Sequence, residues 1–258
     1  MLLKWDKKII GKVTDEGQDF PIISLEYIRD PALPFVLIAA GMHGNEPASV
    51  RALEEFLEEG INEYAAKYNF VIFPRINPVG CARGTRENGN GVDLNRNFLS
   101  EKPEEEVRAI QKYLAALNKK FLVAIDMHED ATDAIVPGYD SKDNPRGMYL
   151  YEVSSSDQRI GEQVLFHLRD DGIAIADNRI IYGENAEEGL IWTPPSYDPL
   201  RAGSFTDKYL LEYTDHTFVI ETPTCWSFPE RVAAHKKALS FILDAQEGVA
   251  SRDKARYK

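Results

Sequence analysis

A histidine and a glutamate stand three residues apart directly after an apolar run, a spacing that suits metal binding. They are His43 and Glu46, and the run before them is Phe35–Ala40. A neutral imidazole and a carboxylate are two of the three protein ligands that a hydrolytic zinc site uses. The pair alone is a weak signal and favours a structural role, in which His43 caps the turn and Glu46 stabilises a helix N-terminus. Residues elsewhere in the chain favour the metal.

Three further apolar runs end in polar residues, at Asn77, His128 and Glu221. In an open α/β sheet, the carboxyl ends of parallel strands meet at one edge, and ligands bind there. Two histidines and one carboxylate around a metal leave a fourth position for water, which is the open arrangement of a catalytic zinc site. The sequence therefore predicts one zinc ion held by His43, Glu46 and His128.

Glu221 ends a different apolar run from the three predicted ligands. A carboxylate beside metal-activated water can take a proton from it and then protonate the leaving amine. We predict this general-base role for Glu221. The simpler alternative is an acidic residue that merely ends a strand.

A polar, glycine-rich loop at 81–98 is too long for a simple connection, which is typical of a functional loop. Asn95 and Arg96 could hold a planar carboxylate by forked hydrogen bonds. Arg86 could polarise the carbonyl that is attacked and stabilise its oxyanion. Asp93 could accept the second ring N–H of a metal-binding histidine. The alternative is a solvated loop with surface arginines.

The elements that must position these residues alternate between strand and helix patterns. Runs without a polar face predict strands that are covered on both sides, and the alternation predicts one α/β domain over residues 1–258. We expect a three-layer α/β/α sandwich with a mixed, largely parallel central sheet. Less regular stretches predict an edge hairpin at 9–27, a helix capped by the serines at 154–156, a strand-like segment at 172–181, a loop at 183–202, a capping box at Ser204 and Asp207 for a short helix, and a closing helix over 230–245.

Composition restricts the function classes. The chain has 30 basic and 42 acidic residues, a formal charge of −12, which argues against binding to nucleic acid or to an anionic membrane. The N-terminus lacks the apolar core and cleavage site of a secretory signal, and no run has the length of a membrane span. Cys81 and Cys225 are expected to be free thiols. These features predict a cytoplasmic protein.

These motifs together resemble the zinc metallocarboxypeptidase family, which has the carboxypeptidase A-like fold. The resemblance covers residues 35–245 and rests on motifs that occur in the family's order. They are His43-x-x-Glu46, Asn77-Pro78-x-Gly80, Arg86, the block GVDLNRNF at 91–98, His128 and Glu221-Thr222. The resemblance implies zinc on the two histidines and Glu46, Glu221 as base, Arg86 on the carbonyl, Asn95 and Arg96 on the substrate's terminal carboxylate, and Asp93 beside the first histidine.

Within that family, the loop sequence is most similar to compact bacterial enzymes such as murein peptide amidases, which cleave an amide bond to a diaminopimelate residue. The family's mobile-loop tyrosine is best matched by Tyr197, whereas Tyr209 and Tyr213 fit a helix face. The specificity pocket is expected near residues 204–207. Phe205 would favour an apolar substrate side chain and Asp207 a cationic one, and the sequence leaves this choice open.

Three functions compete. The leading hypothesis is a zinc-dependent metallopeptidase, a carboxypeptidase or amidase, that hydrolyses an amide next to a free carboxylate in a small peptide. The second is a deacylase of N-acyl amino acids that resembles aspartoacylase and succinylglutamate desuccinylase. Such enzymes carry a small C-terminal β domain, whereas the 37 residues after Glu221 predict a helix. The third is a catalytically silent peptide-binding protein, which the presence of Glu221 disfavours.

Overall fold

The structure, a computed structural model, describes residues 4–133, 140, 144–155, 158–196 and 203–256. Its helices are α1 (Pro47–Glu55), α2 (Pro78–Arg83), α3 (Glu105–Leu117), α4 (Ile160–Asp170) and α5 (Phe228–Arg256). Its strands are β1 (Asp6–Asp15), β2 (Gln18–Tyr27), β3 (Phe35–Ala40), β4 (Asn69–Phe73), β5 (Phe121–Asp130), β6 (Tyr149–Ser154), β7 (Ile180–Ile181), β8 (Glu184–Asn185), β9 (Leu190–Thr193) and β10 (His216–Pro223).

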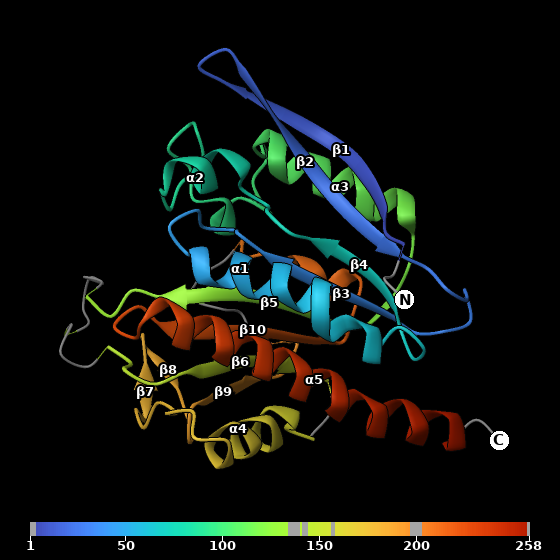
Figure 1. The fold of residues 1–258 in the computed structure, drawn as a ribbon, viewed down its shortest axis with the longest axis vertical. Coiled ribbons are helices and arrows are strands. Elements are labelled where there is room, and N and C mark those ends of the chain that lie inside the picture. Colours follow the sequence, from blue (N-terminus) through green and yellow to red (C-terminus); the bar gives the residue numbers. More distant parts are fainter. Residues whose placement is uncertain (1–3, 134–139, 141–143, 156–157, 197–202, 257–258) are drawn as a thin grey trace.

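Within the described residues, eight strands form one mixed sheet in the order β1-β2-β4-β3-β5-β10-β6-β9 (Figure 1). The central strands β4, β3, β5 and β10 run parallel to one another. Strands β1, β2 and β6 pair antiparallel with their neighbours, and β9 runs parallel to β6. The parallel centre brings the carboxyl ends of β3, β5 and β10 side by side.

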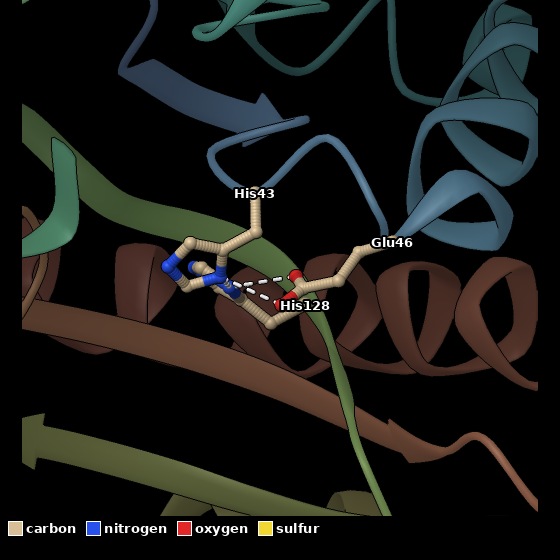
Figure 2. Close-up of side chains that lie close together, drawn as sticks. All are labelled: His43, Glu46 and His128. Atoms are coloured by element: carbon tan, nitrogen blue, oxygen red, sulfur yellow. Dashed lines mark hydrogen bonds and ion pairs between the residues drawn. The ribbon is translucent and has the colours of Figure 1, made fainter. Parts of the chain in front are cut away.

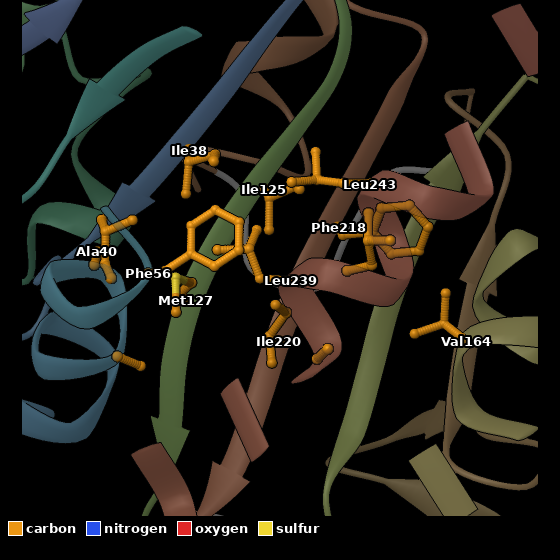
Figure 3. Close-up of a cluster of buried hydrophobic side chains, with 14 of the residues drawn as sticks. Ile38, Ala40, Phe56, Ile125, Met127, Val164, Phe218, Ile220, Leu239 and Leu243 are labelled. Carbon is orange, nitrogen blue, oxygen red and sulfur yellow. The ribbon is translucent and has the colours of Figure 1, made fainter. Parts of the chain in front are cut away.

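Helices cover both faces of the sheet, and each face has its own apolar core. Helices α1, α4 and α5 pack together on one face, over alternate residues of the central strands such as Ile38, Ile125 and Phe218 (Figure 3). The intervening strand residues, such as Leu37, face α3 on the other side. Successive strand residues point to opposite faces, so a strand with two covered faces must be apolar throughout. This confirms the predicted three-layer α/β/α sandwich.

Several predicted elements have the expected positions. The first buried strand is β3, and Pro47 is the first residue of the helix that follows it. The N-terminal hairpin is β1 and β2 at the sheet edge, where Glu16 and Gly17 both have positive φ, of 47° and 82°. Positive φ at both turn positions is what a tight two-residue hairpin requires. The closing helix is α5, which begins before and ends after the predicted 230–245.

Four local predictions are wrong. In 172–181 only Ile180–Ile181 is a strand. The predicted loop at 183–202 contains β9, a strand of the main sheet. The predicted short helix is present as the 3₁₀ helix Tyr209–Glu212, but Ser204 and Asp207 do not cap it, because its N-cap residue is Lys208.

The fourth wrong prediction concerns the start of α4. Ser154 is the last residue of β6, and Ser156 lies outside the described residues. The backbone N–H groups of Ile160 and Gly161 donate instead to the Glu152 carboxylate, at 3.1 and 2.9 Å. A residue from the adjacent strand therefore replaces the local cap that the sequence predicted.

Candidate active site

The side chains of His43, Glu46 and His128 converge on one point (Figure 2). The Nδ1 atoms of the two histidines lie 3.2 Å apart. The Glu46 carboxylate lies between them, with one oxygen 2.6 Å from His43 Nδ1 and the other 2.9 Å from His128 Nδ1. All three side chains are buried, and one ligand atom from each lies within 4.8 Å of the others, so the group could hold a metal ion.

A tight turn between β3 and α1 places the first two of these residues. Gly41 adopts a left-handed conformation with φ of 66°, which glycine reaches without strain. Gly44 packs directly on the start of α2, because a Cβ added there would lie 1.9 Å from the carbonyl carbon of Gly80. The two glycines therefore allow the chain to reverse tightly, and His43 and Glu46 point to the same side of the turn.

A second carboxylate orients each histidine. His43 Nε2 lies 3.2 Å from Asp93 Oδ1, and His128 Nε2 lies 3.0 Å from Asp126 Oδ2. A carboxylate on one ring nitrogen fixes the tautomer and leaves the other nitrogen with a lone pair for a metal. The sequence predicted this role for Asp93 but not for Asp126. The predicted strand ended before His128, whereas β5 continues to Asp130 and puts Asp126 and His128 on one face.

The donor set fits a cation. Burial raises the pKa of the Glu46 carboxyl, but the charges of His43 and His128 outweigh burial and hold that pKa well below its usual range. Burial lowers the pKa of His128, but Asp126 and Glu46 outweigh it and raise that pKa well above its usual value. Three carboxylates around two imidazoles therefore favour positive charge at the centre. Two imidazole nitrogens and one carboxylate are a donor set that suits zinc.

Arg86 lies at the edge of this cluster. Its Nη2 and Nε atoms donate to Asp93 Oδ2 at 3.0 and 3.3 Å, and its Nη1 lies 3.3 Å from His43 Nδ1. Burial lowers the pKa of Arg86, but Asp93, Glu46 and Glu221 outweigh it and raise that pKa. The side chain is 40% exposed, so a charged guanidinium is accessible beside the metal ligands.

The backbone of Arg86 is held by Asn77. The Asn77 side chain caps α2 by accepting from Gly80 N at 2.8 Å, and its Nδ2 donates to Arg86 O at 3.3 Å. The Asn77-Pro78-x-Gly80 motif thus supports the site without facing its centre.

Glu221 pairs with His128 across the adjacent parallel strands β10 and β5. Residues paired in this way point to the same face of a sheet. Glu221 lines a cavity of about 60 Å³ together with Asn95 and Arg96. The structure thus brings Glu221, the metal ligands and the Asn95-Arg96 pair to the same edge of the sheet.

The turn at 203–205 docks on the loop that carries Asn95 and Arg96. Asn95 Oδ1 accepts from Phe205 N at 2.9 Å, and Phe98 N donates to Gly203 O at 3.0 Å. Gly203 has φ of 93°, and a Cβ there would lie 2.6 Å from Arg96 O. The two segments are therefore in close contact. Tyr197, predicted to bind substrate, lies outside the described residues.

On the face of the sheet that α5 covers, residues that were not among the predicted site residues support the metal ligands. The buried carboxylate of Glu129 accepts from Ala48 N at 2.6 Å and forms an ion pair with Arg231 of α5. The Glu129 backbone N–H donates to Glu46 at 3.1 Å. His235 of α5 is fully buried against Thr222, with Nε2 3.0 Å from Thr222 Oγ1. Successive side chains of β5 and β10 point to opposite faces of the sheet. If this alternation is continued past the apolar residues of the two strands, it places Glu129 and Thr222 on the face toward α5.

Comparison with protein families gives a match over residues 32–165, more than half of the chain, to the succinylglutamate desuccinylase/aspartoacylase catalytic domain. The chain belongs to this family. The segment matched to the succinylglutamate desuccinylase/aspartoacylase family includes all three metal-binding candidates, Arg86 and Arg96, whereas Glu221 lies beyond it.

Curated relatives of this family member include murein peptide amidase A of Escherichia coli, which is 45% identical over 62 residues. That match spans 24% of this chain and only 24% of the relative. Carboxypeptidase D of Mus musculus is 21% identical over 264 residues, which span 86% of this chain and 19% of the relative.

Solved structures with a similar fold include proteins named as metallopeptidases or amidases. A protein of Shewanella amazonensis, provisionally named a metallopeptidase, superposes with a TM-score of 0.74 at 23% identity and covers 93% of this chain and 86% of its own. A metallo-carboxypeptidase of Burkholderia cenocepacia gives 0.65 at 16% identity, over 96% and 66% of the two chains. Murein-tripeptide amidase of Escherichia coli gives 0.56 at 19% identity, over 93% and 92%.

These matches confirm the resemblance to zinc metallocarboxypeptidases and murein peptide amidases, and the fold it implied. The family to which the chain belongs is the one named in the second hypothesis, the deacylase of N-acyl amino acids. The relatives carry the names of hydrolases, which supports an enzyme of that class. Among the described residues, the helices are all too short or too polar to cross a membrane.

Proposed function

We propose that this protein is a zinc-dependent hydrolase of the carboxypeptidase or amidase type. Its substrate would be a small peptide, or an acylated amino acid, in which the cleaved amide lies next to a free carboxylate. The observation that carries the proposal is the shared sheet edge at which Glu221 pairs with His128, one of three converging candidate ligands. We further propose that the chain acts as one catalytic domain in the cytoplasm.

His43, Glu46 and His128 would hold the ion, because their ligand atoms face one another and are shielded from solvent. When bound, zinc polarises the scissile carbonyl and lowers the pKa of water. The carboxylates of Asp93 and Asp126 keep the two imidazoles in the orientation that leaves Nδ1 free for the ion.

Glu221 would act as the general base. Its carboxylate takes a proton as water adds to the amide carbon, and it delivers that proton to the nitrogen as the C–N bond breaks. The products are a free amine and a carboxylic acid. The Arg86 guanidinium, beside His43, would stabilise the negative charge that develops on the carbonyl oxygen.

Arg96 and Asn95 would hold the substrate carboxylate. Both line the cavity that contains Glu221. Asn95 Oδ1 already accepts from Phe205 N, so the amide NH₂ group is the part of its side chain that can donate to an anion. An arginine fork beside an amide donor suits a planar carboxylate.

Deacylation of N-acyl amino acids remains the second candidate function. The observation that favours it is the match to the succinylglutamate desuccinylase/aspartoacylase catalytic domain. Both candidates use the same chemistry on an amide, and they differ in whether the acyl side of the bond is a peptide or a small acid.

Metal content and the activity of Glu221→Gln test the shared mechanism. The purified protein should bind one equivalent of zinc and hydrolyse short peptides or N-acyl amino acids. Glu221→Gln should retain the zinc and lose activity by about 10²–10⁴-fold. Glu212→Gln, which changes an exposed glutamate on the 3₁₀ turn before β10, is the matched control and should be fully active.

A protein without stoichiometric metal, or one that stays fully active after Glu221→Gln, would exclude this mechanism. Peptide binding by the zinc-loaded protein without any turnover would instead favour a silent binding protein. The ratio of kcat/KM for peptides to that for N-acyl amino acids chooses between the two hydrolytic functions.

A further inference from the structure

The residues that directly follow His128 and Glu221 point to the opposite face of the sheet, toward α5. They are Glu129 and Thr222, which pair with each other across β5 and β10 just as His128 pairs with Glu221. Because successive strand residues point to opposite faces, one pair faces the site and the next pair faces α5. Both Glu129 and Thr222 are buried. A side chain of α5 can therefore hold the ends of these two strands from behind the site.

Helix α5 contacts this second pair through two side chains that lie one helical turn apart. Arg231 forms an ion pair with the Glu129 carboxylate, and Nε2 of His235 lies 3.0 Å from Thr222 Oγ1. Residues four positions apart lie on the same face of a helix, so Arg231 and His235 both face the strands. The ends of β5 and β10 thus each have a polar contact with α5.

The contact between His235 and Thr222 lies where β10 loses one of its neighbouring strands. The pairing of β10 with β6 ends at Glu221 and Tyr149, so Thr222 and Pro223 pair with β5 alone. Pro223 has no backbone N–H with which the pairing to β6 could continue. The residue directly after Glu221 is therefore held on one edge by β5 and on the α5 face by His235.

We propose that His235 is a positioning residue for the general base. Its hydrogen bond to Thr222 fixes the end of β10, and thereby the place of the Glu221 carboxylate beside the metal ligands. The proposal rests on the proposed function, because a displaced carboxylate slows a reaction only if Glu221 takes part in it. A displacement of about 1 Å can cost about a hundredfold in rate. His235 itself lies on the other face of the sheet and touches no reacting atom.

A second buried contact between α5 and β10 provides a matched comparison. Gln246 of α5 is fully buried, and its Nε2 lies 3.5 Å from Nδ1 of His216, the first residue of β10. His216 stands five residues before Glu221, which corresponds to about 16 Å along a strand. A change at Gln246 therefore alters a polar contact between the same helix and the same strand, but far from the site.

Paired variants test whether the hydrogen bond itself matters. Thr222→Val and His235→Leu each remove one partner, whereas Thr222→Ser and His235→Gln keep a hydroxyl and an amide N–H that can restore the bond. The first two should lower kcat about tenfold to hundredfold, with KM unchanged and one equivalent of zinc still bound. The two conservative variants should retain most of kcat. The double variant Thr222→Val/His235→Leu should be no slower than the slower single variant, because both changes break the same contact.

Gln246→Met is the control that separates positioning from a general loss of stability. It should keep full kcat even if urea unfolding shows that it is as destabilised as His235→Leu. If His235→Leu does not fold, the comparison of Thr222→Val with Thr222→Ser decides the inference alone, because valine and serine there change only one small side chain.

The outcomes separate the two proposals. Full kcat for Thr222→Val and His235→Leu, or losses of the same size in the conservative variants or in Gln246→Met, overturn this inference and leave the hydrolase proposal intact. A complete lack of hydrolysis by the unmodified protein overturns the hydrolase proposal. Crystal structures of the zinc-loaded unmodified protein and of zinc-loaded Thr222→Val then decide the inference: a displaced Glu221 carboxylate supports it, and an unchanged one overturns it.

Discussion

Asp126 Oδ2 lies 3.0 Å from His128 Nε2, and the two residues stand two positions apart on the same face of β5. Asp126 is completely buried, and its other oxygen has no hydrogen-bond partner among the described residues. The carboxylate thus has one described polar contact, which is to the histidine. The relationship makes Asp126 a positioning residue for the metal-binding nitrogen.

Asp126→Asn should weaken zinc binding about 10–100-fold, the usual effect of removing a carboxylate behind a metal-bound histidine. The amide is neutral and can present N–H to the ring, so it no longer fixes the tautomer. Competition with a chromogenic chelator measures the affinity. Asp177→Asn, on an exposed carboxylate away from the ligands, should leave the affinity unchanged. Equal affinities for Asp126→Asn and the unmodified protein would refute the positioning role.

Gly44→Ala should disrupt the turn that carries the first two ligands. An added Cβ would meet the backbone of Gly80 and Cys81 at 1.9–2.3 Å, and backbone cannot move aside as a flexible side chain can. We expect a loss of about 3 kcal/mol or more in the free energy of unfolding, and loss of zinc binding. Gly84→Ala isolates the backbone effect, because the φ of Gly84 is 67° and no atom of the described residues lies within 4 Å of an added Cβ. That variant should lose only about 1–2 kcal/mol.

Arg231→Met should destabilise the protein by about 3–5 kcal/mol, because it leaves the Glu129 carboxylate buried without its counter-ion. The Glu129 side chain has no exposed surface. Burial raises the pKa of the Glu129 carboxyl even with Arg231 present. The double variant Arg231→Met/Glu129→Gln removes both charges and should recover most of the loss. Urea unfolding of the unmodified protein, the single variants Arg231→Met and Glu129→Gln, and the double variant measures this coupling, and additive effects would contradict it.

Glu106→Gln should stabilise the protein at neutral pH. Glu106 is 2% exposed, and burial raises the pKa of its carboxyl, although Asn88 donates to it. The pKa of Glu106 is therefore higher in the folded protein than in the unfolded chain, where it is about 4.3. The protonated carboxyl stabilises the fold below that pH, and this stabilisation is lost as the pH rises through the pKa of the folded protein. Glutamine does not ionise and so avoids that loss.

The gain from Glu106→Gln should therefore be small near pH 4 and grow toward pH 7, as measured by urea unfolding across that range. Glu105→Gln, on the exposed neighbour in the same helical turn, is the control and should show little change with pH. A gain from Glu106→Gln that is the same at every pH would show that ionisation of Glu106 is not its source.

Much of the site was predictable because its signals are local. The apolar run at 35–40 has no polar face, so it had to be a strand covered on both sides, and β3 has those bounds. His43, Glu46, His128 and Glu221 stand at or near the ends of such runs, and the parallel centre of the sheet brings these ends together. Their types and spacing were enough to expect a site for one metal ion beside a carboxylate.

The tertiary structure decided what depends on contacts between distant segments. Glu152 caps α4 from a neighbouring strand, and pairing with β6 holds β9 in the sheet although β9 is only four residues long. The cavity beside Glu221 is lined by Glu184 of β8 as well as by Asp207, whereas the side chain of Phe205 is buried in the core. Local periodicity says which side chains share a face of one element. The free energy of the whole fold determines which element packs against that face. This packing in turn determines which side chains line the substrate pocket.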